Sequence, residues 1–201
     1  SDLRRLERAV ASKECEVVST MPKNIGSGKS VKLKDARFIV KGVTCPVSVD
    51  LKMTADGTDK EGSLKFNLRY EIKEEQFKKL AQIDNVELQG SLSFGANIPT
   101  DDRSDMSMHF NVDLNGKAHS LAEGDLKTYL RGNYSMNGNA KDNRMSGGGE
   151  FAFGVEFKDF TGELKTTSSI NTAAGKAEAK YFVNNKEITD KKVYQIDNCW
   201  R

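Results

Sequence analysis

The sequence predicts an all-β domain with minor α content, namely a long, curved antiparallel meander that forms a barrel or a half-barrel. Apolar and polar residues alternate with a period of two through most of the chain, which is typical of strands with one buried face. Short groups of turn-forming residues separate these runs, and such connections join antiparallel neighbours. We expect about nine to eleven strands.

Length and composition fit one domain that spans residues 1–201. The chain has 37% hydrophobic and 30% charged residues, which lies within the range of folded globular proteins. Its 31 basic and 29 acidic side chains leave a net charge of only +2. No overall field attracts the protein to nucleic acid, so we expect no nucleic-acid partner.

The alternation is most regular in residues 63–72, where leucine, phenylalanine, tyrosine and isoleucine share one face and charged or polar residues share the other. A strand with one apolar face explains such a run. The same partition predicts strands around residues 47–53, 86–94, 105–114, 126–136, 151–157 and 160–170.

Two segments have helical periodicity instead. In residues 1–13, Leu3, Leu6 and Val10 form an apolar stripe among charged residues, which predicts a short helix packed on the sheet. A second short helix is expected near residues 74–82, which place Phe77 and Leu80 on one side.

Turn-forming residues are expected to connect the strands. Gly90, Gly132, Gly154 and Gly162 fall inside predicted strands and suit a strongly curved sheet. The predicted turns are Asp56-Gly57, Gly95 to Ser104, Asn115-Gly116, the polar segment Asn137 to Gly149, Lys158-Asp159 and Asn184-Asn185.

The cysteines and the absence of long apolar runs favour an extracytoplasmic protein, whether periplasmic, in the cell envelope or secreted. Cys15, Cys45 and Cys199 match no zinc-binding spacing and predict one disulfide of unassigned connectivity. Three reduced cysteines are the alternative. No run is long enough for a transmembrane helix, and the start at Ser1 suggests that a targeting segment has been removed.

Two segments resemble ligand-binding loops only in part. Residues 26–30 end like a phosphate-binding loop, but Lys23 stands where its first glycine belongs. Asn111, Asp113 and Asn115 imitate a calcium loop, but Ala122 stands where the closing carboxylate belongs. We therefore expect no metal and no cofactor.

One short segment holds an acid, a nucleophile and a base, namely Asp105, Ser107 and His109. Residues two apart on a strand lie roughly 6.5 to 7 Å apart, whereas a catalytic relay needs hydrogen-bond contact. A solvated strand face explains these residues better, and we expect that the protein is not an enzyme.

The apolar face of the predicted sheet must be buried, and three schemes do so. The sheet can curl around an apolar ligand, as lipid-carrying barrels do. It can pack into a filled core and serve as a structural or adhesion domain whose loops contact a protein partner. It can also form a small outer-membrane-type barrel with this face toward lipid. In architecture, a curved sheet with an N-terminal helix resembles periplasmic lipoprotein carriers, although no motif indicates membership of a family.

Of these schemes, the first is our prediction: a non-enzymatic extracytoplasmic protein that holds a hydrophobic small molecule or lipid in a curved β-sheet. Membrane association without a transmembrane helix is compatible with it. The ligand would contact inward-facing apolar side chains, and the candidates are Phe66, Leu68, Phe94, Met108, Phe110, Phe151, Phe153 and Phe157.

Overall fold

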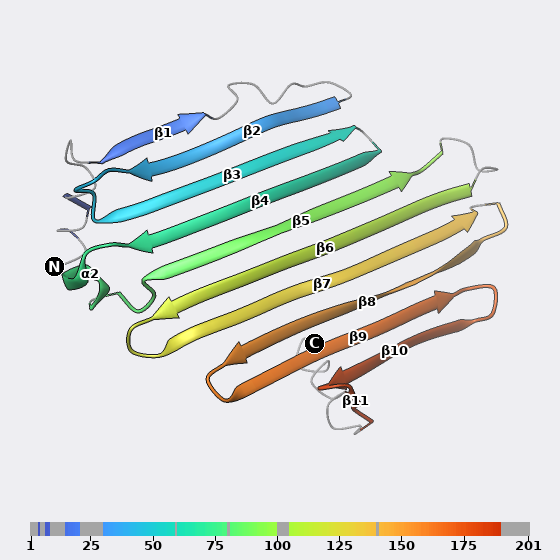
Figure 1. The fold of residues 1–201 in the computed structure, drawn as a ribbon. Coiled ribbons are helices and arrows are strands. Elements are labelled where there is room, and N and C mark those ends of the chain that lie inside the picture. The colour runs from blue at the N-terminus through green and yellow to red at the C-terminus, as the bar shows by residue number, and fades with distance from the viewer. Residues whose placement is uncertain are drawn as a thin grey trace.

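The protein folds as one antiparallel β-meander. The computed structural model describes residues 4, 7–8, 15–20, 30–58, 60–79, 81–99, 105–139 and 141–189. Eleven strands follow one another in the sheet in the same order as in the sequence (Figure 1). The prediction of an all-β meander is confirmed.

Most strands are long, because the alternation of apolar and polar residues continues without interruption over twelve or more residues. One short helix, α2, lies between β4 and β5. The strands are β1 (Glu16–Thr20), β2 (Ser30–Lys41), β3 (Val47–Thr58), β4 (Glu61–Ile72), β5 (Asn85–Asn97), β6 (Asp105–Ser120), β7 (Gly124–Asn139), β8 (Arg144–Phe157), β9 (Phe160–Asn171), β10 (Lys176–Val183) and β11 (Lys186–Glu187), and the helix is α2 (Glu75–Lys78).

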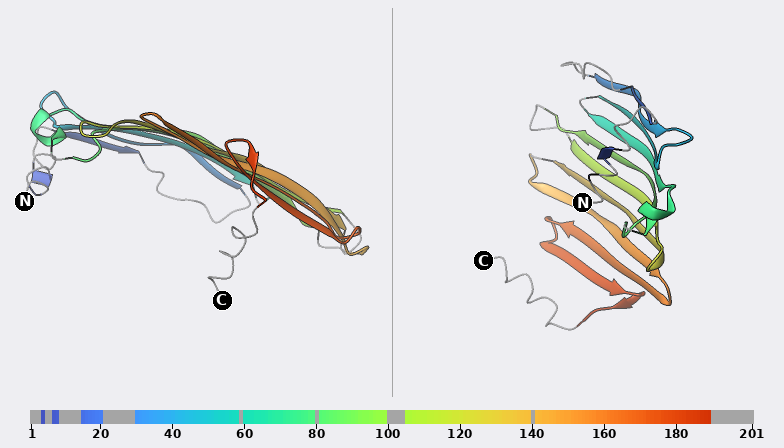
Figure 2. Two further views of the ribbon diagram at one scale, coloured as in Figure 1. Left: turned by 90° about the horizontal axis from the view of Figure 1, so that it is seen from below. Right: turned by 90° about the vertical axis from the view of Figure 1, so that its left-hand side faces the viewer.

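The sheet is bent and does not close on itself. Figure 2 shows it edge-on as an arc with a convex and a concave side. Its outermost strands, β1 and β11, each pair on one side only, so the half-barrel is the predicted form that the described residues adopt. A register shift between Leu33 and Ala36 interrupts the pairing of β2 with β3. Such irregularities bend a strand and increase its local twist.

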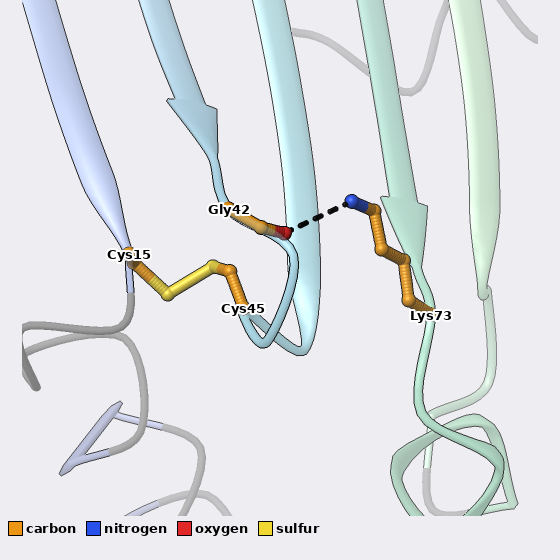
Figure 3. Close-up of a disulfide and its surroundings, with 4 residues drawn as sticks. All are labelled: Cys15, Gly42, Cys45 and Lys73. Atoms are coloured by element: carbon orange, nitrogen blue, oxygen red, sulfur yellow. Dashed lines mark hydrogen bonds between the residues drawn. A yellow bond between two sulfur atoms is a disulfide. The ribbon is translucent and has the colours of Figure 1, made fainter.

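A small hydrophobic core lies at one end of the sheet. Cys45, Val47, Ile72 and Phe77 of α2 are buried together there, with Val40. A disulfide joins Cys15 to Cys45 and thereby ties the start of β1 to the turn between β2 and β3 (Figure 3). The predicted disulfide is present, with its connectivity now assigned, while Cys199 lies outside the described residues.

Three hydrogen bonds hold the segments around this core in place. The amide of Lys73 donates to Pro46 O at 2.7 Å, and the Lys73 ammonium donates to Gly42 O at 3.4 Å, so the end of β4 is fixed to the β2–β3 turn (Figure 3). The amide of Ile72 donates to Asp84 O at 2.8 Å. The α2 segment is thus closed back onto the sheet.

The two predicted helices have different outcomes. The second one forms, but as a single turn from Glu75 to Lys78 rather than over residues 74–82. Of the predicted N-terminal helix, Arg4, Glu7 and Arg8 are helical and exposed. The other residues of that segment lie outside the described part of the chain, and so does its predicted packing on the sheet.

Two predicted turns are wrong. Asn115-Gly116 lies within β6 and pairs with β5 and β7, and the reversal comes at residues 121–123. Asp56-Gly57 lies within β3. The turn between β7 and β8, at residues 141–143, does lie within the predicted segment Asn137 to Gly149, although the ends of that segment belong to the two strands. The glycines at these places are compatible with strands because a large side chain or a backbone group from the neighbouring strand occupies the space above them. Lys158-Asp159 and Asn184-Asn185 are turns, as predicted.

We predict that Cys45→Ser lowers the free energy of unfolding by about 2–4 kcal/mol, because the disulfide restricts the unfolded chain over a sequence separation of 30 residues. Urea denaturation monitored by circular dichroism measures this loss. A reductant should destabilise the wild-type protein to the level of the variant and leave the variant itself unchanged. Equal stability of the oxidised wild type and the variant would contradict this role of the disulfide.

A candidate ligand-binding face

The strand register places apolar side chains on one side of the sheet and charged side chains on the other. We call the first side the apolar face. From β3 to β10, no described strand residue on this face is charged. Its large members are Val47, Val49, Leu51, Met53, Leu64, Phe66, Leu68, Tyr70, Ile72, Val86, Leu88, Leu92, Phe94, Met106, Met108, Phe110, Val112, Leu114, Leu126, Leu130, Tyr134, Met136, Met145, Phe151, Phe153, Val155, Phe157, Phe160, Leu164, Ile170, Tyr181 and Val183.

Cross-strand pairs make this face continuous. Leu64 of β4 pairs with Leu92 of β5, which pairs with Val112 of β6. The row continues through Gly132 of β7 to Phe151 of β8. Side chains that stand directly opposite each other across two strands are close enough to pack, so each row is a strip of apolar contact.

Glycines on the apolar face leave room for aromatic rings of neighbouring residues to lie over the backbone. A Cβ atom at Gly62 would come within 2.6 Å of Cε1 of Phe94, so the Phe94 ring already occupies that space. The rings of Phe151 and Phe160 lie in the same way above Gly132 and Gly162. Large side chains therefore spread along the sheet and present broad surfaces outward.

Much of this face remains exposed. Phe94, Phe153 and Met108 expose 52%, 48% and 45% of their surfaces. Among the described residues of this face, only the core near the disulfide and scattered residues such as Ala36 and Val112 are buried. Large apolar side chains that stay half exposed across several adjacent strands are unusual on the surface of a monomeric protein.

A groove of about 300 Å³ lies on the apolar face between β3 and β6, at the end remote from the disulfide. Leu64, Leu92, Phe94 and Phe110 line it together with Ala55. The side chains that line it from this face are all apolar, so it suits part of an apolar molecule.

The opposite, polar face carries an ordered hydrogen-bonded cluster. The Tyr129 hydroxyl donates to the Glu163 carboxylate, and the tyrosine ring passes over Gly154 to reach it. The guanidinium of Arg131 lies 4.8 Å from the centre of that ring, and it also donates to Asn115 Oδ1 at 3.1 Å. The hydrogen bond to Glu163, which favours the neutral phenol, raises the pKa of Tyr129 above its ordinary value.

The apolar face is the concave one. A cavity of about 550 Å³ on the polar face is lined by Tyr129 and Glu163 and by Asn184 and Asn185 of the turn before β11. Figure 2 shows β11 on the convex side of the arc. The polar face is therefore convex, and the apolar side chains line the hollow side of the bent sheet.

All eight candidate residues predicted from the sequence lie on the apolar face. Phe94, Met108, Phe110 and Phe153 are exposed, whereas Phe66, Leu68, Phe151 and Phe157 are partly buried. Their contact with a ligand stays a prediction. Phe160, Leu164 and Val183 are not among the candidate ligand contacts predicted from the sequence, although they expose 61%, 47% and 44% of their surfaces on the same face. Their alternation could have identified them, because it continues through β9 and β10.

The described residues that resemble a calcium loop or a catalytic triad lie on a regular strand and not in a loop. Asn111, Asp113 and Asn115 stand in a row along β6, an uninterrupted strand, on the polar face. Asp105 and His109 belong to the same face of the same strand and are exposed. The segment 26–29 lies outside the described residues. Within the described part of the chain, no cluster of three or more His, Cys, Asp or Glu residues that could hold a metal is found.

We predict that Tyr129 ionises at higher pH than an ordinary tyrosine, whose pKa is about 10. Tyr129→Phe should remove a late-ionising phenol from the absorbance titration of tyrosine, and Glu163→Gln should shift that ionisation toward lower pH. Because the folded state holds the phenol proton more tightly, the resulting stability is complete below about pH 10 and is lost as pH rises through the raised pKa. Loss of an ordinary ionisation in Tyr129→Phe would contradict this contact.

Among the described residues, no helix is both long and apolar enough to cross a membrane. No protein-family model, no curated protein and no solved structure matches the chain. The geometry of the apolar face is thus the basis for inferring function.

Proposed function

We propose that this protein is a non-enzymatic extracytoplasmic binding protein that holds an apolar, lipid-like ligand on its apolar face. One observation carries the proposal. A concave, uncharged face spans the long strands of the sheet, and several of its large side chains, including Phe94, Phe153 and Met108, are about half exposed. A chain that needed this face only as its own core would bury it within the fold.

The size of the face favours an occupant. Strands of twelve residues span about 40 Å, and the seven strands β3 to β9 stack over about 34 Å, so the face covers roughly 1,300 Å² in projection. The largest apolar patch on a typical monomer is about 300–600 Å². Removing apolar surface from water is favourable by about 25 cal/mol of free energy per Å². A covered apolar face is therefore strongly favoured over one that is exposed to water.

The chemistry of the face favours hydrocarbon over a charged ligand. Its polar groups on the long strands are hydroxyls, including those of Tyr70, Tyr134 and Thr166, and burial raises the pKa of Tyr70. No Lys, Arg, Asp or Glu side chain stands on it from β3 to β10 to pair with a charged group. Acyl chains or other hydrocarbon match this lining, and a charged head group would remain at its rim.

The disulfide supports a location outside the cytoplasm. Cys15 and Cys45 are joined at the core end of the sheet. Disulfides persist in oxidising compartments and are rare where thiols are kept reduced. We place the protein in the periplasm, the cell envelope or the extracellular space on this basis.

The test is native mass spectrometry of protein purified from its natural host, followed by organic extraction. We expect a co-purifying lipid on the wild-type protein. Phe94→Asp should reduce the bound fraction at least several-fold, because it places a carboxylate in the groove of the apolar face. Ser91→Asp adds the same charge to the polar face of β5, opposite Lys65 and outside the groove, and should retain the lipid.

Two results would contradict the proposal. One is wild-type protein that is repeatedly free of lipid and takes up none after incubation with oleic acid. The other is equal loss of lipid in Phe94→Asp and Ser91→Asp, which would mean that the binding does not depend on the apolar face.

A further inference from the structure

We propose that the protein is a homodimer in which two copies face each other through their apolar faces and enclose the ligand between them. A single copy then supplies only half of the binding site. This inference rests on the proposed function, because the space enclosed by the two apolar faces would hold the lipid-like ligand.

The area available is the first argument. The apolar face of one copy covers roughly 1,300 Å² in projection, whereas a stable protein interface takes about 800 Å² from each partner. The exposed side chains Phe94 and Phe153 lie on β5 and β8, well apart across the sheet, so the uncovered surface is broad. Closure by a second sheet covers a surface of this breadth, with the ligand filling the space that remains.

The absence of charge is the second argument. Interfaces select a different protein partly by complementary charge, and the apolar face offers none from β3 to β10. A purely apolar face is complementary to itself. Two copies related by a twofold axis present the same patch to each other, which is the commonest symmetry of soluble oligomers.

The sheet edges provide the third argument, because they disfavour pairing edge to edge. The free edge at β10 carries Lys176, Glu178 and Lys180, all exposed, and β11 pairs with its last two residues. The opposite edge is the short strand β1, whose Glu16 lies 3.7 Å from Lys41. Charged and short edge strands are how natural sheets prevent edge-to-edge addition. Association is therefore directed to the faces.

Curvature then determines what two facing sheets enclose. The apolar face is the hollow side of the arc, so two such faces that pack against each other also leave a lined space between them (Figure 2). This space is bounded by hydrocarbon on both sides, whereas the face of a single copy is open to water on one side. The second copy thereby supplies the missing wall of the site.

Analytical ultracentrifugation over a range of concentrations tests the proposal, with bound lipid measured in parallel by native mass spectrometry. The wild-type protein should sediment as a dimer. Phe153→Glu should raise the dimer dissociation constant at least about 30-fold, the effect expected for an interface residue of central importance. Because Phe153 is 48% exposed in the single chain, this change should leave the fold intact, which circular dichroism verifies.

Ala152→Glu is the matched control, since it adds the same carboxylate one residue away on the polar face, between Arg131 and Lys165. This variant should remain dimeric. If Phe153→Glu does not fold, Met108→Glu, with Ser107→Glu as its control, provides the same comparison on β6.

The outcomes separate the two proposals. A wild-type monomer that carries lipid overturns the dimer and leaves the proposed function standing. A dimer without lipid supports the dimer and refutes the proposed function. A monomer that binds phosphatidylglycerol vesicles through Phe153 overturns the dimer in favour of a membrane surface. Dissociation of Ala152→Glu to the same extent as Phe153→Glu overturns pairing through the apolar face.

Discussion

The segregation of charge across the sheet is the constraint on which the rest of this structure depends. Every strand from β3 to β10 directs its charged side chains to the convex face, and in an antiparallel sheet that is possible only if the register is maintained. A slip of one residue in any strand would bring charges onto the apolar face. The register is therefore tightly specified, although little of the face is buried within the chain.

A single-layered sheet with one small core divides its stabilisation unevenly. The end near the disulfide has buried contacts among Cys45, Ile72 and Phe77, and the backbone of Lys73 fixes it further. The rest of the sheet is held by backbone ladders and cross-strand pairs, which are individually weak. The proposed occupant of the apolar face would add to this part of the sheet the burial that the chain alone does not supply, and binding would then be coupled to stability.

The period-two alternation predicted the strands and their common face because it follows directly from strand geometry. It misplaced the turn at Asn115-Gly116 because an Asn-Gly pair also suits a strand in which the Thr128 side chain lies close to the glycine. Whether the sheet closes depends on twist and curvature summed over all strands, which no local pattern encodes. The exposure of Phe94 and the burial of Ile72 follow the same alternation in sequence, so only the tertiary structure separates the exposed apolar side chains from the core.

The methionines allow the most direct test of the central claim, that the apolar face is covered by an apolar occupant in the working protein. Of the six methionines, Met53, Met106, Met108, Met136 and Met145 all lie on that face. Photoreactive methionine incorporated throughout the protein, followed by irradiation and mass spectrometry, reports what contacts them. Our account predicts adducts with lipid and cross-links between the apolar faces of two chains. If the photoreactive methionines at these positions react only with water, the apolar face has no apolar occupant and our account is contradicted.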